Sequence, residues 1–409
     1  MAFVEPTGPD SWRVRYWTDT GVHGSICGFS SETEARAKAA EIDTDRRRGT
    51  FIDPAAGKLA VGQWASTWFE ALDVGPATDS QYRCLYRCHI APRWGRRALG
   101  DVSGTDVHIW ARKLRTAGYA DSTVASVVKL LSMMLADAAA ERLIAANPIR
   151  PQRRGRRVHR VRRERLWATP EQVLQIALGA VELAGGWAGL LIVTGAWTGA
   201  RWGELLGLRR HNLHLTVDRP RMVIDPDTGS LHEVDGRLFL GPPKTAESAR
   251  TITLPRFLVE LLTRHLDSHT HPHVFCTEHG EHPRRSNFAR RVMRPAADGT
   301  HTRPRAPQRL DPVAPGLTFH GLRHSHKTWM IADHVPQVAQ ARRLGHTMPD
   351  KIEDIYSHVA AEVDTHLLTC LQQRWDTATA ALTTTAPATT SGPGLELMGR
   401  EWPAVAPGV

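Results

Sequence analysis

The chain has 409 residues, of which 41% are hydrophobic and 23% charged, a composition typical of a folded protein with roughly two to four domains. Its 52 lysines and arginines outnumber 42 acidic residues, and the formal charge of +10 favours a polyanionic partner such as nucleic acid. We find no run of about 18 apolar residues that could span a membrane, and no signal peptide. We therefore expect that the protein does not associate with a membrane. The five cysteines are scattered, which favours a reducing cytoplasm over a disulfide framework.

The first part of the chain, residues 1–54, is predicted to be a small domain of strands and one helix. Apolar and polar side chains alternate over residues 11–29, which predicts two strands joined by a turn. A hydroxyl cap and early acids then predict a helix over residues 31–44. Arg13 and Arg15 share the polar strand face and are candidates for DNA binding, while a purely structural lobe is the alternative.

Residues 57–149 are predicted to form a helical domain. Apolar side chains recur at helical spacing in four stretches, which are 64–72, 82–90, 107–114 and 122–140, the last capped by Ser122. The basic linker over residues 150–168 cannot bury a core, and we interpret it as a strap over a phosphate backbone rather than a solvated tether. Its candidate DNA-binding residues are Arg153, Arg154, Arg156, Arg157 and Arg160.

Residues 169–383 are predicted to form a larger, mainly helical domain. Thr169-Pro170-Glu171 is a typical helix start, and a short sheet is expected around residues 222–254. The composition turns to Thr, Ala, Pro and Gly from residue 379, and we expect a disordered tail over 384–409. The fold class is therefore multidomain and mainly α, with an α+β third domain and a small N-terminal sheet-plus-helix domain.

Two clusters in the third domain are suited to phosphate chemistry. Arg201 and Glu204 lie three residues apart at an expected helix start, where a guanidinium can grip a phosphate through two parallel hydrogen bonds. Residues 241–255 are expected to form a hairpin with Lys244, Ser248 and Arg250 at its tip, from which a lysine could donate a proton. Taken singly, the first cluster is typical of a surface ion pair and the second of a solvated turn.

Two further clusters follow. His320 and Arg323 lie three residues apart on an expected helix that Thr318 could cap, and they combine a phosphate grip with a group that titrates near neutral pH. His346 follows a glycine and is expected near a turn, and Tyr356 comes ten residues later.

The order of these residues resembles the tyrosine recombinase (phage integrase) family, and the chain is similar to integrases of actinobacterial phages or integrative elements. The matching residues are Arg201, Lys244, His320, Arg323, His346 and Tyr356. The resemblance implies that Tyr356 attacks a DNA phosphate to give a 3′-phosphotyrosyl link. Arg201 and Arg323 would stabilise the charge, Lys244 would protonate the leaving oxygen, His320 would assist proton transfer, and His346 would bind the phosphate. Glu204 would support the site.

The resemblance also implies partners. These are double-stranded DNA attachment sites, three further copies of the chain in a homotetramer, and an excisionase or host DNA-bending protein, all in the cytoplasm of a bacterial host at the nucleoid. No cofactor or metal is expected, and the histidines around Cys276 do not match a familiar zinc pattern. A helix over residues 360–382 is a candidate for packing on a neighbouring subunit. Trp202 is bulkier than expected for the family, and the stretch 293–318 is longer.

Two other hypotheses stay open at this point. The chain could be a DNA-binding regulator that kept the fold and lost the chemistry, although its complete set of candidate residues argues against this. It could also resemble a type IB topoisomerase, which relaxes DNA without pairing sites. The N-terminal domain and the basic linker favour the integrase.

Overall fold

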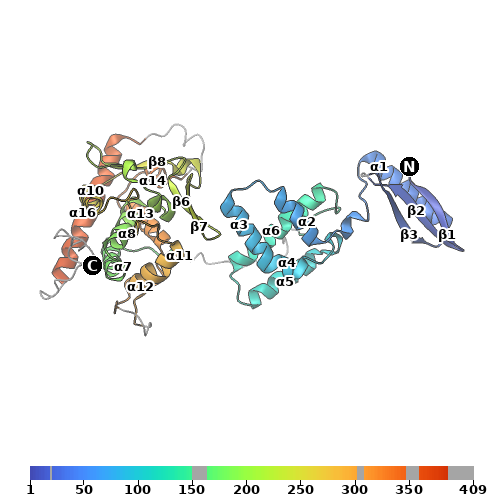
Figure 1. The fold of residues 1–409 in the computed structure, drawn as a ribbon, viewed down its shortest axis with the longest axis horizontal. Coiled ribbons are helices and arrows are strands. Elements are labelled where there is room, and N and C mark those ends of the chain that lie inside the picture. Colours follow the sequence, from blue (N-terminus) through green and yellow to red (C-terminus); the bar gives the residue numbers. More distant parts are fainter. Residues whose placement is uncertain (19–20, 150–163, 302–307, 347–358, 386–409) are drawn as a thin grey trace. The chain divides into compact units, whose positions relative to one another are not determined.

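The computed structural model divides into two compact units, Met1–His159 and Arg160–Val409 (Figure 1). It describes residues 1–18, 21–149, 164–301, 308–346 and 359–385. Each unit is described by itself below.

The N-terminal part is a three-stranded antiparallel sheet packed against one helix. The strands β1 (Phe3–Gly8), β2 (Ser11–Trp17) and β3 (His23–Phe29) pair in the order β1-β2-β3. Val14 and Tyr16 of β2 are buried against α1 (Glu32–Arg48). Strand β1 is not foreseen from the sequence, and α1 extends past the predicted end at residue 44, to where Gly49 adopts a left-handed conformation with φ 71°.

The helical part of the first unit surrounds its own apolar core. Its elements are α2 (Val61–Glu70), α3 (Pro76–Leu85), a π-helical turn (Tyr86–Ile90), α4 (Ala91–Trp94), α5 (Gly104–Thr116) and α6 (Asp121–Ala140). The predicted Ser122 cap is wrong, because α6 begins at Asp121 and Ala120 provides no side-chain cap. Among the described residues, α6 alone is long and apolar enough to span a membrane, yet its Val127, Leu131 and Met134 are buried in this core.

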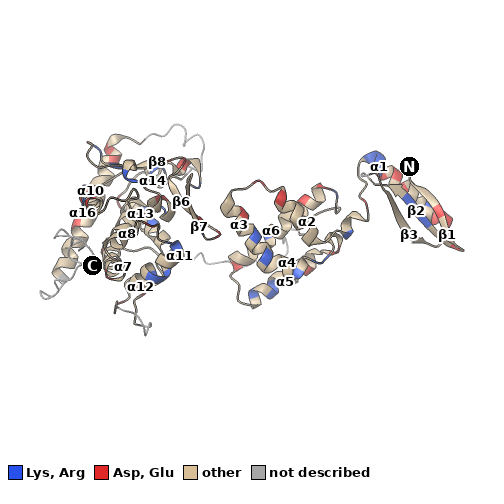
Figure 2. Ribbon diagram, in the orientation of Figure 1, with Lys and Arg blue, Asp and Glu red and all other residues tan. Residues whose placement is uncertain are grey.

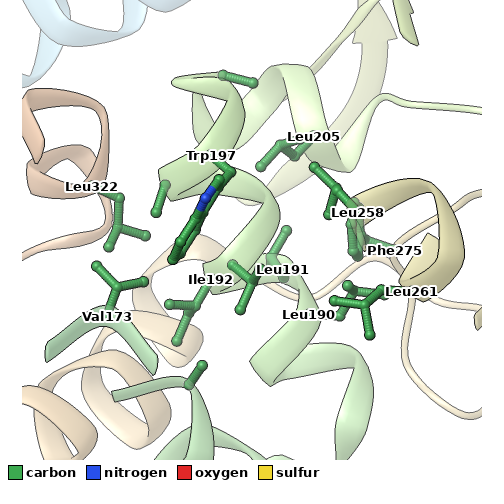
Figure 3. Packing of buried hydrophobic residues seen from close by; sticks show 14 of the residues in the cluster. Val173, Leu190, Leu191, Ile192, Trp197, Leu205, Leu258, Leu261, Phe275 and Leu322 are labelled. Carbon is green, nitrogen blue, oxygen red and sulfur yellow. The ribbon is translucent and has the colours of Figure 1, made fainter. Parts of the chain in front are cut away.

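The second unit is built around α8 (Gly186–Thr198), a helix that is apolar on all sides. A helix of this kind needs neighbours on every face. The Trp197 ring lies among Val173, Ile192 and Leu322 in this core (Figure 3). The neighbouring α7 (Pro170–Ala184) begins as predicted, since the Thr169 hydroxyl accepts a hydrogen bond from the Gln172 amide. The other helices are α9 (Trp202–Leu206), α10 (Arg256–Asp267), α11 (Arg285–Phe288), α12 (Arg294–Asp298), α13 (Phe319–Ala332), α14 (Gln337–Leu344) and α16 (Ala361–Thr385).

Two small antiparallel sheets belong to this unit. One contains β4 (Leu213–His214), β5 (Arg221–Ile224) and β8 (Arg250–Thr253), in the order β4-β5-β8, and the other pairs β6 (Ser230–Val234) with β7 (Arg237–Gly241). The predicted hairpin over residues 241–255 is therefore wrong. That segment leaves β7, passes through a short 3-10 turn at Ala246–Ser248, and enters β8 of the other sheet.

The long helix α16 packs within its own unit. Leu367, Leu371 and Trp375 are buried in the unit's core, and the Trp375 ring stacks on Phe257 at a centroid distance of 4.1 Å. The Trp197 indole also donates to the carbonyl of Leu371 at 3.0 Å. Much of the apolar side of this helix is thus covered within its own unit, and packing of the helix on a neighbouring subunit stays a prediction. The helix also continues through residues 379–385, where the sequence composition favoured disorder.

Candidate active site

Arg201 and Glu204 are joined at the start of α9. Helix α8 ends at Gly199 in a left-handed conformation with φ 66°, and Arg201 occupies the N-cap position of α9. The Glu204 carboxylate accepts from the Arg201 backbone amide at 2.9 Å and from Arg201 Nη1 at 2.6 Å. The Glu204 side chain is only 2% exposed, whereas that of Arg201 is 26% exposed. The buried acid therefore fixes an arginine that still reaches the surface.

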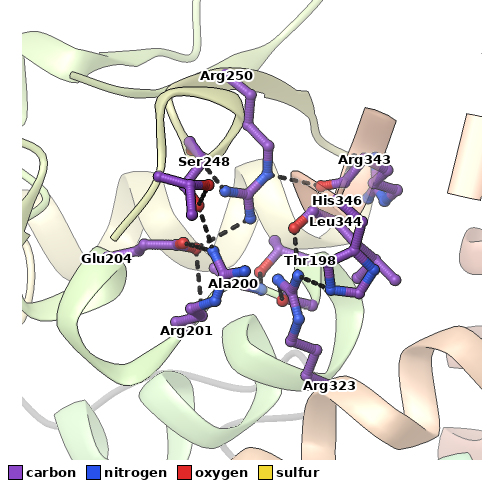
Figure 4. A network of polar contacts seen from close by, with 12 residues as sticks. Thr198, Ala200, Arg201, Glu204, Ser248, Arg250, Arg323, Arg343, Leu344 and His346 are labelled. Carbon is purple, nitrogen blue, oxygen red and sulfur yellow. Dashed lines mark hydrogen bonds and ion pairs between the residues drawn. The ribbon is translucent and has the colours of Figure 1, made fainter. Parts of the chain in front are cut away.

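Arg250 contacts the same carboxylate from strand β8 (Figure 4). Its Nη2 lies 2.9 Å from Glu204 Oε2, its Nη1 donates to the Ser248 carbonyl at 2.7 Å, and its Nε donates to the Arg343 carbonyl at 2.7 Å. The Ser248 hydroxyl also accepts from Arg201 Nη1 at 2.7 Å. Two guanidinium groups thus share one buried carboxylate.

Arg323 and His346 complete the cluster from two other segments. The Thr318 hydroxyl accepts from the Gly321 amide and so caps α13, as predicted. Arg323, one turn into α13, is buried and donates through Nη1 to the Gly199 carbonyl at 2.7 Å. Its Nη2 contacts the Leu344 carbonyl and lies 2.9 Å from His346 Nε2. The structure therefore places His346 in direct contact with Arg323.

The cluster carries an excess of positive charge. Among the described residues, Glu204 is the one carboxylate that is hydrogen-bonded to Arg201, Arg250 or Arg323. Desolvation raises the pKa of Glu204, but Arg250 and Arg201 outweigh it and hold the pKa below its ordinary value. Burial and the neighbouring Arg201 lower the pKa of Arg323 to about 9. Three cations facing one anion suit a negatively charged ligand such as a phosphodiester.

His346 and His320 both have pKa values well below the ordinary value, so both rings are neutral at pH 7. Desolvation, followed by Arg323 and Arg201, lowers the pKa of His346 to about 4. His320 lies in the first turn of α13 with an exposed side chain, and its ring centroid is 5.0 Å from that of His324. Its pKa also falls to about 4 through desolvation, His324 and the two arginines. A neutral histidine can accept a proton.

Arg343 lies behind the cluster and is not foreseen from the sequence. It is buried on α14 and donates to His326 Nε2 at 2.9 Å and to the Trp197 carbonyl at 3.1 Å. Its Nη1 reaches the Thr253 carbonyl at 3.2 Å. This side chain ties α8, β8, α13 and α14 together beneath the site.

Arg250 was expected at an exposed hairpin tip, but its side chain is only 6% exposed. The alternation along β8 contains the signal for this burial. Arg250, Ile252 and Leu254 occupy every second position, and Ile252 and Leu254 are core residues. A strand reading of the segment would have placed Arg250 on the inner face.

Of the other candidate residues, Lys244 makes no hydrogen bond to the arginine cluster within the described ranges, and Tyr356 and the linker arginines fall outside the described residues. Lys244 is exposed on the connection between β7 and β8. The linker arginines are Arg153, Arg154, Arg156, Arg157 and Arg160. The described part of the chain holds no group of three or more His, Cys, Asp or Glu side chains placed to bind a metal ion.

Arg13 and Arg15 lie together on the face of β2 that points away from the buried Val14. Figure 2 shows basic positions on β2 and acidic positions on β1. Both side chains contact Glu5, with nitrogen–oxygen distances of 2.6 Å for Arg13 and 3.6 Å for Arg15, and both are about one-third exposed, at 38% and 34%. They are therefore accessible but already paired with an acid.

A cluster of arginines that is fixed by helix starts and backbone carbonyls is suited to the charge stabilisation that phosphoryl transfer needs. Known proteins agree with this. Residues 174–362 match the phage integrase family, and the chain is similar to proteins named as integrases and tyrosine recombinases. The chain is 26% identical over 354 residues to a putative prophage phiRv2 integrase of Mycobacterium tuberculosis, covering 82% of this chain and 86% of that protein.

Solved structures share the fold. The Tn1549 transposon integrase in complex with a circular intermediate DNA has a TM-score of 0.60 at 17% identity, and the match covers 76% of this chain and 99% of that one. A lambda integrase tetramer bound to a Holliday junction has a TM-score of 0.51 at 16% identity, covering 87% and 98%. The predicted fold class is confirmed by these likenesses.

Proposed function

We propose that this chain is a site-specific DNA recombinase, an integrase that cuts and rejoins DNA through a 3′-phosphotyrosyl intermediate. The observation that carries the proposal is the convergence of Arg201, Arg323 and His346 from three separate segments, with Glu204 as the only carboxylate bonded to the cluster among the described residues. Such a site binds one phosphate and stabilises the additional charge of its transition state.

The chemistry assigns one role to each group. Arg201 and Arg323 hold the nonbridging oxygens of the phosphate. The Tyr356 oxygen forms a bond to phosphorus while the bond from phosphorus to the 5′ oxygen breaks. The phenolic proton passes to neutral His320, and Lys244 gives a proton to the departing 5′ oxygen. Rejoining runs through the same steps in reverse, and the phosphotyrosyl bond retains the energy of the original linkage.

His346 has a defined tautomer in this scheme. A guanidinium has donors only, so His346 Nε2 must accept from Arg323, and the proton of the neutral ring resides on Nδ1. That N–H is then available to donate to a phosphate oxygen. The low pKa of His346 is consistent with this role, because the ring stays neutral over the working pH range.

The other parts of the chain would organise the DNA. Residues 1–54 would bind arm-type sites, residues 57–149 and the linker 150–168 would grip the core site, and residues 169–383 would supply the chemistry. Support for a tetramer on two duplexes comes from the lambda integrase, which was solved as a tetramer bound to a Holliday junction. Double-stranded attachment sites, an excisionase or host bending protein, and a place at the bacterial nucleoid belong to the same proposal.

A nicked suicide duplex that carries the attachment core tests the proposal. The wild-type chain should form a covalent protein–DNA adduct, because the released strand fragment diffuses away and prevents rejoining. Tyr356→Phe should form no adduct while DNA binding persists. An adduct that survives this substitution would overturn the assignment of the nucleophile.

The same assay separates the rival functions. A catalytically inactive regulator would bind the duplex and form no adduct even as the wild type. A type IB topoisomerase-like enzyme would relax supercoiled plasmids that lack any attachment site. The integrase should do so only weakly, and should join two site-bearing duplexes instead.

A further inference from the structure

Arg250 contacts both halves of the arginine cluster. Its Nη2 meets the carboxylate that holds Arg201, and its Nε meets the carbonyl of Arg343. The residue after Arg343 is Leu344, whose own carbonyl is contacted by Arg323. One guanidinium therefore links the Arg201 side of the site to the chain segment that leads to His346.

The packing around this link is close. Gly345 adopts φ 62°, and a Cβ atom there would lie 2.7 Å from the Glu247 carbonyl oxygen, 3.0 Å from Ser248 Cα and 3.2 Å from Arg250 Cδ. The turn before β8 therefore lies directly against the residue that precedes His346. A shift of the Arg250 side chain would move both neighbours.

Arg250 does not reach the substrate side itself. Its side chain is 6% exposed, whereas that of Arg201 is 26% exposed. Its three nitrogens are directed to a carboxylate and two backbone carbonyls, which is the planar, forked geometry that only arginine provides. A lysine could meet one of these acceptors but not all three.

We propose that Arg250 is a positioning residue for the recombination reaction, which sets the distance between the Arg201 and Arg323 guanidiniums on the scissile phosphate. The inference rests on the proposed function. Arg250→Lys keeps the charge and loses the fork, so it should slow single-turnover cleavage on the order of 100-fold, the usual cost of misplacing catalytic groups by about 1 Å. DNA affinity should stay within about threefold, because phosphate contacts elsewhere dominate binding.

A change of substrate separates positioning from a merely structural role. Replacing one nonbridging oxygen of the scissile phosphate by a methyl group removes the negative charge that the arginines must stabilise. The ratio of methylphosphonate to phosphodiester cleavage should therefore rise by about tenfold or more in Arg250→Lys and in Arg201→Lys. Arg256→Lys is the matched control, since that arginine is 87% exposed on α10 and pairs with Glu260. It should cleave both substrates like the wild type.

Each outcome decides a separate question. Wild type that fails to form an adduct overturns the proposed function and this inference with it. Wild type that cleaves, together with Arg250→Lys that cleaves within about twofold of it or keeps the wild-type substrate ratio, overturns only the positioning role. If Arg250→Lys does not melt cooperatively, Arg250→Gln is judged by the same ratio, and a second failure to fold assigns Arg250 to the fold alone.

Discussion

Arg323 Nη2 lies 2.9 Å from His346 Nε2, although both residues could carry positive charge. The contact is a hydrogen bond only while the imidazole is neutral, since a protonated ring has no acceptor to offer. The lowered pKa of His346 follows from this arrangement, with desolvation and the Arg323 charge as its main causes. Because the pKa of His346 is low, its ring stays neutral and keeps accepting the hydrogen bond that holds the Arg323 guanidinium.

Acid should destabilise the DNA-free protein between about pH 6.5 and pH 4. The pKa values of His346, His320, His282 and His269 all fall to about 4 in the folded chain, and that of the fully buried His326 falls further. The unfolded chain binds more protons in this window, so stability rises with pH through it and is lost as pH falls. The melting temperature at pH 5 should be lower than at pH 7 by at least about 2–4 °C.

The variant His326→Gln provides the control for this acid effect. A glutamine oxygen can still accept from Arg343 Nε, which lies 2.9 Å from His326 Nε2, but it does not titrate. The difference between the two melting temperatures should shrink in this variant. An equal difference in variant and wild type would assign the acid sensitivity to other groups.

Lys244→Ala should lose cleavage of ordinary DNA by roughly 100- to 10,000-fold, the usual contribution of a general acid. Lys244 is exposed on the connection between β7 and β8, so its amine is accessible to a substrate. A duplex with sulfur in place of the 5′ bridging oxygen should restore the rate, because a thiol with a pKa of about 8.5 leaves without a proton. The variant Tyr356→Phe should gain nothing from the sulfur. If sulfur fails to rescue Lys244→Ala, this lysine is not the acid.

Gly345→Ala should damage the site as well as the fold. Two costs add at this position, the left-handed φ of 62° and the contact of a Cβ at 2.7 Å from the Glu247 carbonyl oxygen. Gly236 in the β6–β7 turn isolates the first cost, because its φ is 76° but nothing lies within 4 Å of a Cβ there. Gly236→Ala should lower the free energy of unfolding by about 1–2 kcal/mol, and Gly345→Ala by about 1–3 kcal/mol more.

Cleavage rates should separate these two glycine variants further. Gly236→Ala should cleave the suicide duplex at the wild-type rate, whereas Gly345→Ala should lose most of it through the displaced His346. Equal unfolding free energies in urea titrations would show that the backbone at Gly345 adjusts without strain.

Arg343→Ala should be the most damaging arginine substitution for stability. Removing the side chain leaves His326 and the carbonyls of Trp197 and Thr253 without their donor in the interior. The expected loss is about 3–5 kcal/mol in the free energy of unfolding, because each buried acceptor left without a donor costs about 1–3 kcal/mol. Arg264→Ala, at an exposed position of α10, should change it by less than about 0.5 kcal/mol. Similar losses in the two variants would contradict the buried role.

Much of this site could be predicted from the sequence because its signals are local. Thr169 and Thr318 predict helix starts, because a threonine side chain can cap the backbone amide three residues later. Both caps form in the structure. The pairing of Arg201 with Glu204 also needs only three residues of separation. Within such distances, composition and spacing determine geometry almost directly.

The tertiary structure alone decided which guanidiniums become buried and what they hold. Arg250 bonds to Glu204 and to the Arg343 carbonyl across 46 and 93 residues of chain, and no local pattern contains those partners. The placement of α16 was decided in the same way, because Leu371 and Trp375 pack around Trp197 in the core of the unit. Burial and long-range hydrogen bonding are properties of the packed chain, since a polar group is stable inside only where distant partners arrive to satisfy it.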